Sequence, residues 1–294
     1  MRRSVLAILL AAVLALASCS SSGGSDDAGP DENGGSEDTT ANGGGGEDGP
    51  DIEDPAAWVV DSVDATLAAN SFEIDSELAL QLDRTDLALT VSGPVDYEKL
   101  VADVEMEVDS GTASGTMSLR VDGETLWLAA DGEGVPAVPG GSTWVEGRAS
   151  LLEDAESFGS EGLLGTIYAL RAAEEVEAHE TQEAGEVTTT RFTTSFTYGE
   201  AVEAAGPDRD AFTGSFSLRG FDHAVIDVEV WIGDDGVIRS LTYALEESDP
   251  GQLTGSYDLT LTAVGEPVDP PDAPDPGDVT SGPEAESWLE ANMA

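Results

Sequence analysis

Apolar and polar residues alternate with a period of two along most of the chain from residue 72 to residue 264. In the run 72–83, apolar side chains occupy most of the alternate positions, and acids and Gln81 stand between them. This arrangement predicts a strand with one face in the core and the other in solvent. The predicted strands cover 72–83, 87–91, 104–109, 117–121, 126–128, 143–146, 174–180, 187–198, 224–232, 237–246 and 257–264. The pattern therefore predicts about ten or eleven antiparallel strands.

Helical spacing interrupts this pattern at four places. Pro55 suits a first helical turn with Asp54 as its cap, and the apolar spacing from Trp58 to Leu67 predicts a leading helix that ends at Asn70. A helical insertion is predicted within 151–173 and a short helix at 200–205. A last short helix from Pro283 either frays or docks on the domain, and the sequence leaves both open.

A sheet with this many strands and one apolar face must curl around something or pack on a second layer. Few short helices are available to cover it, so the expected fold is α+β. The candidate inner-face residues are Phe72, Ile74, Leu78, Leu80, Val104, Met106, Val108, Leu126, Leu128, Phe192 and Phe196. Periodicity cannot distinguish an ordinary packed core from the wall of a ligand pocket.

The first 18 residues have the layout of a secretory signal peptide. Arg2 and Arg3 precede an apolar run at 5–17, which is about half the roughly 20 residues of a membrane-spanning helix. The run ends on Leu-Ala-Ser-Cys, and Cys19 is the only cysteine. This ending resembles the bacterial lipobox, which implies lipidation of Cys19 and cleavage before it. The alternative is an ordinary cleaved signal with an incidental cysteine.

Composition divides the rest of the chain. Residues 19–54 begin at the lipidated cysteine and are rich in Gly, Ser and acids, without aromatic residues, which predicts a disordered acidic tether. Its root-mean-square reach is roughly 30–35 Å. Residues 55–264 are long enough for one β-rich domain with a substantial core. Residues 265–294 form a tail rich in Pro and Asp.

The chain is strongly acidic, with 60 Asp and Glu against 11 Lys and Arg and a formal net charge of −49. Without a basic patch, nucleic acid and anionic lipid headgroups are poor partners. The acids are spread along every predicted strand, which favours a solvated acidic coat over a cation-binding function. A single cysteine leaves no intramolecular disulfide, so stability must come from packing.

The sequence offers little support for catalysis. Its two histidines, His179 and His223, stand in no recognisable hydrolase, zinc or phosphate-loop spacing. The run 234–236 is expected to be a turn, because it lacks the remaining ligands of a calcium loop. We expect no catalytic residue, no metal site and no cofactor.

Two stretches resemble one known family. The hairpin DVEVWIGDDGVIRSLTY (227–243) and the ending YDLTLTAVGEPVD (257–269) are similar to those of the LppX/LprG lipoproteins of actinobacteria, part of the LolA-like group of envelope lipid and lipoprotein carriers. The lipobox, the leading helix and the strand at 143–146 fit as well, and the resemblance covers most of 55–272. It implies a strongly curved antiparallel half-barrel with the leading helix and the helical insertion covering its concave face.

The resemblance implies a lipoprotein on the extracytoplasmic face of the cell membrane, anchored through Cys19. It would bind or carry a hydrophobic, acyl-chain ligand along the inner-face residues, without enzymatic activity, and could deliver it to an envelope transport partner. An anchored interaction or sensor module with a filled core is the alternative, and an enzyme is a distant third. An open apolar space of several hundred Å³ separates the first two possibilities.

Overall fold

A computed structural model describes residues 52–82, 85–110, 114–133, 137–151, 164–184, 187–215, 221–246 and 253–293 of the chain. Cys19, the signal peptide, most of the tether and positions 152–163 of the helical insertion lie outside these residues. What the sequence indicates for them stays a prediction.

The described strands form one unclosed sheet in the order β12-β6-β5-β4-β3-β2-β1-β11-β10-β9-β8-β7. Every neighbouring pair is antiparallel except β12 and β6, which are parallel. The strands are β1 (Ser71–Leu82), β2 (Thr85–Asp96), β3 (Val101–Asp109), β4 (Ser114–Asp122), β5 (Thr125–Gly132), β6 (Trp144–Arg148), β7 (Glu177–Ala184), β8 (Val187–Thr197), β9 (Val225–Gly233), β10 (Ile238–Glu246), β11 (Leu253–Thr262) and β12 (Val279–Thr280). The predicted α+β half-barrel fold is confirmed.

Several strands differ from the prediction at their ends, most of all β2, which was predicted at 87–91, and two further features of the sheet differ as well. The strand predicted at 174–180 forms as β7 at Glu177–Ala184, because buried Ala173 still caps the preceding helix through a bond from its N–H to Leu170 O of 3.1 Å. The two-residue strand β12 was not predicted, because two residues are too short to show a period.

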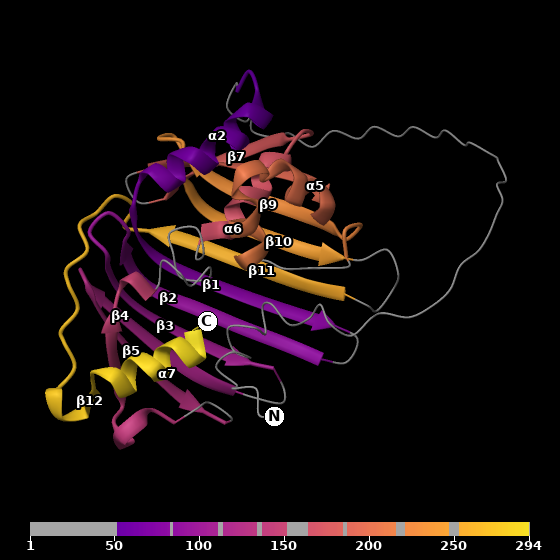
Figure 1. Ribbon diagram of the computed structural model, residues 1–294. Helices are drawn as coiled ribbons and strands as arrows, with labels where there is room; N and C mark the ends of the chain where they lie inside the picture. The colour runs from indigo at the N-terminus through magenta and orange to yellow at the C-terminus, as the bar shows by residue number, and fades with distance from the viewer. Residues whose placement is uncertain are drawn as a thin grey trace, which may run out of the picture.

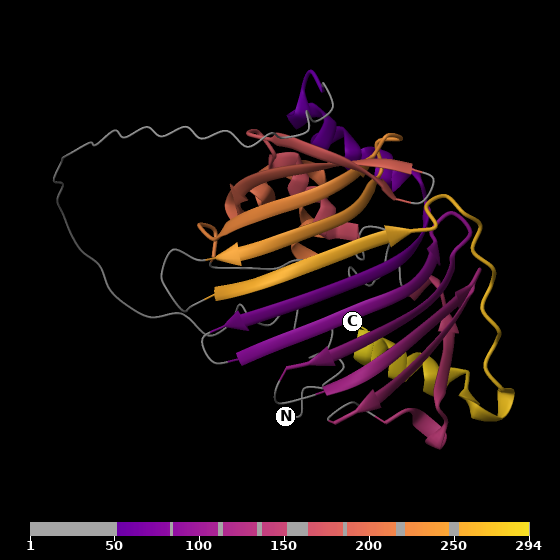
Figure 2. The same ribbon diagram turned by 180° about the vertical axis from the view of Figure 1, so that it is seen from behind.

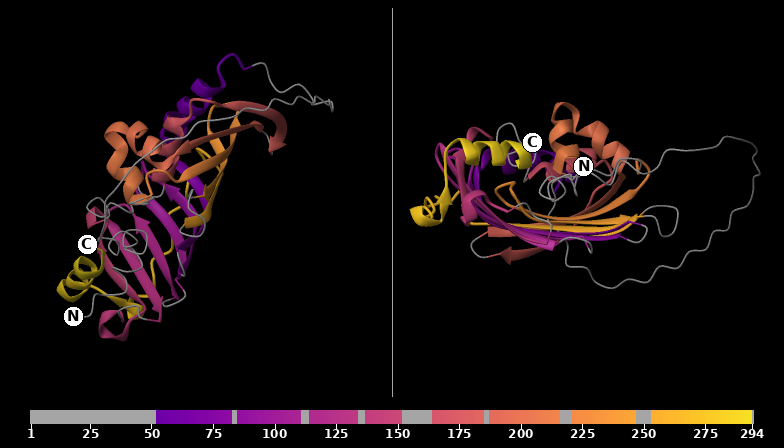
Figure 3. Two further views of the ribbon diagram at one scale, coloured as in Figure 1. Left: turned by 90° about the vertical axis from the view of Figure 1, so that its right-hand side faces the viewer. Right: turned by 60° about the horizontal axis from the view of Figure 1, so that its bottom comes forward.

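The sheet is strongly curved, and the described helices other than the short 3₁₀ turns at Pro139–Gly141 and Pro276–Asp278 lie on its concave side (Figures 1, 2 and 3). Gly93 in β2 has a φ of +136°. A Cβ there would lie 2.1 Å from the carbonyl oxygen of Asp103 on the neighbouring strand. Only glycine allows this close approach of two backbones.

Two groups of helices cover the two ends of the concave face. The first group, the roof helices, consists of α2 (Pro55–Ala68), the 3₁₀ helices η2 (Gly165–Ala172) and η3 (Gly206–Asp208), α5 (Tyr198–Ala204) and α6 (Arg209–Ser215). The second group is α7 (Pro283–Met293) alone, and the short 3₁₀ turns η1 (Pro139–Gly141) and η4 (Pro276–Asp278) lie outside both groups. Of the roof helices, η3 and α6 were not predicted, and the helix predicted at 200–205 forms as α5.

The leading helix forms as predicted. Its cap Asp54 accepts a bond of 3.0 Å from the N–H of Ala57, and Val59 and Val63 are fully buried. Trp58, predicted on the apolar face, is instead 37% exposed. The helix is fixed to the sheet by Thr66, whose hydroxyl oxygen accepts a 3.0 Å bond from the N–H of Ile238 in β10.

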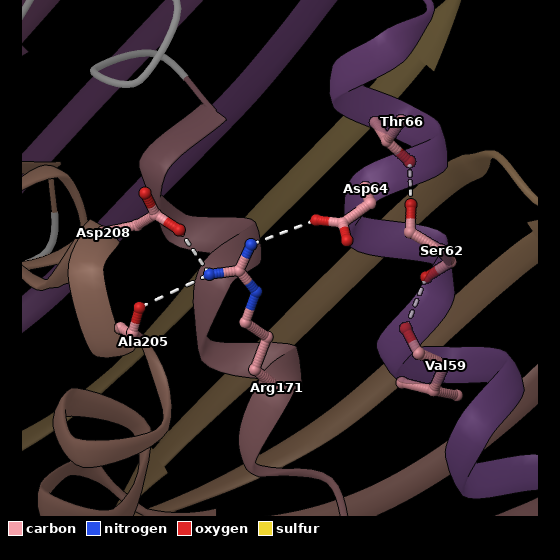
Figure 4. A network of polar contacts seen from close by, with 7 residues as sticks. All are labelled: Val59, Ser62, Asp64, Thr66, Arg171, Ala205 and Asp208. Atoms are coloured by element: carbon pink, nitrogen blue, oxygen red, sulfur yellow. Dashed lines mark hydrogen bonds and ion pairs between the residues drawn. The ribbon is translucent and has the colours of Figure 1, made fainter.

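Arg171 of η2 ties the roof helices together (Figure 4). Its guanidinium donates to Asp64 of α2 at 3.0 Å, to Asp208 of η3, and to the carbonyl oxygen of Ala205 at 3.4 Å. Burial lowers the pKa of Arg171, but the bonds to Asp208 and Asp64 outweigh it and raise the pKa overall. The roof helices are thus held to one another as well as to the sheet.

The tail wraps round the β6 edge of the sheet. Its backbone accepts a bond of 3.2 Å from Arg120, an arginine on the convex side, at Asp272, and β12 then pairs with β6. Beyond β12, α7 lies on the concave side, where Leu289 is fully buried and the indole N–H of Trp288 donates to Ala137 O at 3.1 Å. The last helix therefore docks on the domain, an outcome that the sequence left open.

Acidic residues are arranged regularly on the convex face of the sheet. One register row crosses ten strands and consists of Asp131, Thr116, Glu107, Thr90, Glu77, Asp258, Thr242, Glu229, Thr193 and Glu177. Threonines separate the acids everywhere except at Glu77 and Asp258, which are directly paired. Acids on alternate strands are about 10 Å apart, beyond the Debye length of about 8 Å at physiological salt.

This spacing predicts a stability that rises with salt. Repulsion among the acids weakens when the Debye length falls from about 30 Å at 0.01 M salt to about 3 Å at 1 M. The melting temperature should rise by several degrees over this range, since about 1 kcal/mol corresponds to about 2–4 °C in a domain of this size. Thermal unfolding followed by circular dichroism measures it.

A matched pair of variants tests whether repulsion between acids on the convex face causes this dependence on salt. Glu77→Gln removes the one acid that faces another acid and should raise the melting temperature at low salt. Glu73→Gln on the same strand, opposite Pro94 and Thr262, should change it much less. A melting temperature that does not change with salt concentration, or equal effects of the two variants on it, would contradict this account.

The docking of α7 predicts a local effect of Leu289→Asp. The aspartate would place a charge in a fully buried position, so α7 should detach while the distant strands β8 to β10 stay folded. Amide hydrogen exchange should become fast in 283–293 and stay slow in β8 to β10. The exposed neighbour Glu290→Gln is the control, and unchanged protection of α7 in the Leu289 variant would refute its docking.

Candidate functional site

The strand registers decide which residues share the concave face, because directly paired residues point to the same side of a sheet. Leu78 of β1 pairs with Leu89 of β2, which pairs with Val108 of β3. Tyr257, which also pairs with Leu78, contacts Thr166 of the roof helix η2 and so marks this side as the concave one. The registers place all eleven candidate inner-face residues there.

Ten of these eleven residues are buried, and Met106 is half-buried. They belong to two separate apolar clusters. The larger one packs the roof helices against β1 to β3 and β8 to β11. The smaller one packs Ala285 and Leu289 of α7 against β4, β5 and β6, with Leu126 and Leu128 fully buried in it. At these two ends the concave face is an ordinary packed core.

The middle of the concave face, where the two clusters meet, is packed less completely than the two ends. We call it the central strip and define it as two adjoining register rows on β1 to β5, namely Ser76, Val91, Met106, Met117 and Ala130 in one and Leu89 and Val108 in the other. Ser76, Leu89, Met106 and Ala130 are half-buried, and Val91, Met117 and Val108 keep 7–8% exposure.

Side chains at the two ends of the concave face are buried more completely than those of the strip. Val230 and Leu241 under the roof helices, and Leu128 and Val145 under α7, have no exposed surface. The described helices make their sheet contacts mainly on β8 and β10 at one end and on β6 at the other. The strip lies between these contacts and keeps apolar side chains within reach of solvent.

Hydroxyl groups converge beside the strip. The hydroxyl of Tyr243 donates to Thr166 O at 2.8 Å, and the hydroxyl of Thr166 donates to the Tyr257 hydroxyl at 3.0 Å. Burial raises the pKa of Tyr257 to about 12, although hydrogen bonds from Thr166 and from the strip residue Ser76 favour its ionised form. Burial also raises the pKa of Tyr243 well above its usual value.

Tyr97, directly after β2, is a third buried phenol. Burial raises its pKa, and the proximity of Tyr257 adds to the effect. All these phenols are therefore neutral at physiological pH and act as hydrogen-bonding groups without charge. The sequence prediction missed them, although Tyr243 and Tyr257 occupy apolar-phase positions of their strands, which is the signal that could have found them.

The convex face has hollows of a different character. Three open hollows of about 520, 730 and 470 Å³ lie over the sheet, and all three are lined mainly by outward-facing polar and acidic residues or by small ones. Glu107 and Asp131 line one of them, and Asp227 and Glu229 line another. Such surroundings suit water and do not suit an acyl chain.

The two histidines do not assemble a reactive site. The ring Nε2 of His179 lies 2.7 Å from the Thr193 hydroxyl, and His223 is exposed. Within the described ranges no three His, Cys, Asp or Glu side chains converge as a metal site would require. No helix in these ranges is long and apolar enough to cross a membrane.

Neither protein-family models nor curated proteins match the sequence. Among solved structures, the chain is similar to the Mycobacterium tuberculosis lipoprotein LppX, with 18% identity, coverage of 73% of this chain and 96% of that one, and a TM-score of 0.39. It is also similar to LprF from Mycobacterium bovis, with 13% identity, coverage of 74% and 96%, and a TM-score of 0.40. A putative outer membrane lipoprotein-sorting protein domain from Vibrio parahaemolyticus follows, with 8% identity, coverage of 71% and 90%, and a TM-score of 0.20.

These similar structures include the lipoprotein LppX and a putative lipoprotein-sorting domain. Their scores are too low to carry an argument, so the half-barrel fold rests on the strand order and registers of this chain.

Proposed function

We propose that this protein is a lipid-anchored lipoprotein of the cell envelope that binds or carries a hydrophobic ligand on its concave face. The central strip is the observation that supports the proposal. Its two rows present apolar side chains that are not fully covered, between two ends where equivalent side chains are completely buried.

The dimensions of the strip suit an acyl chain. It crosses five strands, which are four spacings of about 4.8 Å and give a length of about 19 Å. Each methylene that leaves water for such a surface contributes about 0.8 kcal/mol. The strip and the ligand would therefore cover each other's apolar surface, which favours binding.

A second candidate function has one observation in its favour. Ten of the eleven candidate inner-face residues are already buried without a ligand, as in an anchored interaction or sensor module with a filled core. The two candidates differ at the strip. A filled core leaves no room at the strip, whereas a carrier accepts a chain along it, between the ends that the roof helices and α7 cover.

The substitution Met106→Trp tests the difference. Met106 is half-buried in the strip, so an indole there should occupy ligand space, lower the binding of an acyl-chain fluorescent probe at least about tenfold and leave the melting temperature nearly unchanged. Leu128→Trp is the matched control in the packed end. Overfilling that position should cost about 1–3 kcal/mol of stability while the surviving folded protein still binds the probe.

Two outcomes would favour the filled core instead. One is a wild-type protein that does not bind the probe at all. The other is a Met106 variant that loses as much stability as the Leu128 variant.

The anchor is tested separately, because Cys19 lies outside the described residues. We propose that acylated Cys19 holds the domain at the extracytoplasmic face of the membrane through the acidic tether. Cys19→Ser should move most of the protein from the membrane fraction to the medium, since the acyl chains supply its strong membrane affinity. Fractionation after a high-salt wash measures this, and a variant that stays with the membrane would disprove the lipid anchor.

A further inference from the structure

Prolines determine the shape of the tail between β11 and η4. Nine of the eleven residues 266–276 are prolines or directly precede one, and both kinds of position favour an extended or polyproline II backbone. Of the described elements, none lies between Thr262 and Pro276. Asp275 has a φ of −58° and a ψ of 126°, within the usual scatter of polyproline II. The tail therefore crosses the domain as an extended segment.

The exposure of this segment has a period of three. Val268 and Pro271 are half-buried and Pro274 is buried, whereas the residues between them are exposed. A polyproline II helix has three residues per turn, so positions i and i+3 lie on the same side of it. One side of residues 268–274, which we call the proline strap, thus rests on the domain while the other sides face water.

Trp127 of β5 lies on the surface that the tail crosses. It shares a register row with Arg120 and Glu146 on the convex side. Trp127 keeps only 8% exposure, although it points away from the concave core and belongs to neither apolar cluster. Three successive residues of β5, 126–128, are buried, so both faces of the sheet are covered at this point.

Arg120 connects this surface to the tail. Its guanidinium lies 4.8 Å from the ring centre of Trp144 in β6, and its Nη1 donates to Asp272 O within the strap at 3.2 Å. Val279, seven residues further on, pairs with Trp144 at the edge of the sheet. The chain between them passes from β4 to the β6 edge, and Figure 2 shows the yellow tail running past the magenta strands to that edge.

We propose that Trp127, Arg120 and Trp144 form a binding site for a proline-rich segment in the polyproline II conformation, with the proline strap as its internal ligand. Aromatic side chains that receive proline rings, together with a donor for a backbone carbonyl oxygen, are the chemistry of such recognition. The partner class is a proline-rich peptide, which takes the same place when the strap leaves. This site lies on the convex face and does not depend on ligand binding at the central strip.

Charge opposes the docking of the strap. Residues 265–294 contain eight acids and no lysine or arginine, and the whole chain carries a formal charge of −49. The affinity must therefore come from ring contacts and from hydrogen bonds to the backbone. Because the strap is repelled by the domain that holds it, it is open to exchange for another proline-rich segment.

The first test uses the chain from residue 19 with Cys19→Ser and two matched proline variants. Pro274→Ala changes the buried side of the strap, and the control Pro270→Ala changes its exposed side. Loss of the strap lowers the effective concentration of α7 at its docking site on the opposite face. Amide hydrogen exchange in 283–293 should become at least about twofold faster with Pro274→Ala and change less with Pro270→Ala.

The second test supplies the ligand in trans as a fluorescein-labelled peptide of residues 265–278. In the wild type this peptide must displace a tethered strap, whose effective concentration is on the order of mM. It should therefore bind the double variant Pro271→Ala/Pro274→Ala at least about tenfold more tightly than the wild type, as measured by fluorescence anisotropy.

Substitutions in the double variant locate the peptide. Trp127→Ala should weaken its binding at least about tenfold, and Arg120→Gln should weaken it about two- to tenfold through the lost hydrogen bond. Trp231→Ala is the control, since Trp231 lies on β9, on the other side of β1 from this site. If Trp127→Ala also speeds exchange in β8 to β10, it has disturbed the fold, and Arg120→Gln decides.

Three results would overturn the proposal. One is equal exchange of α7 in the Pro270 and Pro274 variants. Another is a labelled peptide that fails to bind the double variant or binds the wild type equally well. The third is peptide binding that Arg120→Gln leaves unchanged or that Trp231→Ala weakens as much as the substitutions at the site.

Discussion

The structure depends on how one apolar sheet face is covered. In the part of the chain that the structure describes, helices cover the concave face of the unclosed twelve-stranded sheet at its two ends. The roof helices take one end, where Arg171 and Thr66 fix them to one another and to β10. The tail brings α7 round the β6 edge to the other end. What remains between them is the central strip.

The convex face follows from the same constraint. With its helices on the concave side, the sheet meets water on the convex side, and its outward positions can carry charge. Threonines alternate with the acids across the strands, so that Glu77 and Asp258 are the one directly opposed acidic pair in the row. This arrangement lets an acidic coat coexist with a continuous sheet.

Much of this architecture could be predicted from the sequence, because period-two alternation is a local signal. It gave eleven strands and the leading helix, and it placed the candidate inner-face residues on one side. The position of β7 was displaced because the run from Glu174 to Glu180 has few apolar residues to set its phase. The helix α6 and the docking of α7 depend on contacts with distant residues, which a local pattern does not contain.

The candidate site, too, could be predicted only in part from the sequence. Alternation identified Met106 and Val108 as inward-facing, yet it could not distinguish them from Leu128, which is fully buried under α7. That difference arises from which helices lie over which strands, a property of the tertiary structure. The unpaired hydroxyl of Tyr97 is likewise invisible in the sequence, because it depends on the tertiary surroundings of that residue.

Native mass spectrometry of the wild-type domain, made in bacteria without its acyl anchor, tests the central claim most directly. If the strip holds a hydrophobic ligand, the protein should carry an added mass that solvent extraction removes and that is identified as an acyl lipid. A protein whose mass equals that of its chain alone, and which gains none when incubated with acyl esters, would contradict the account.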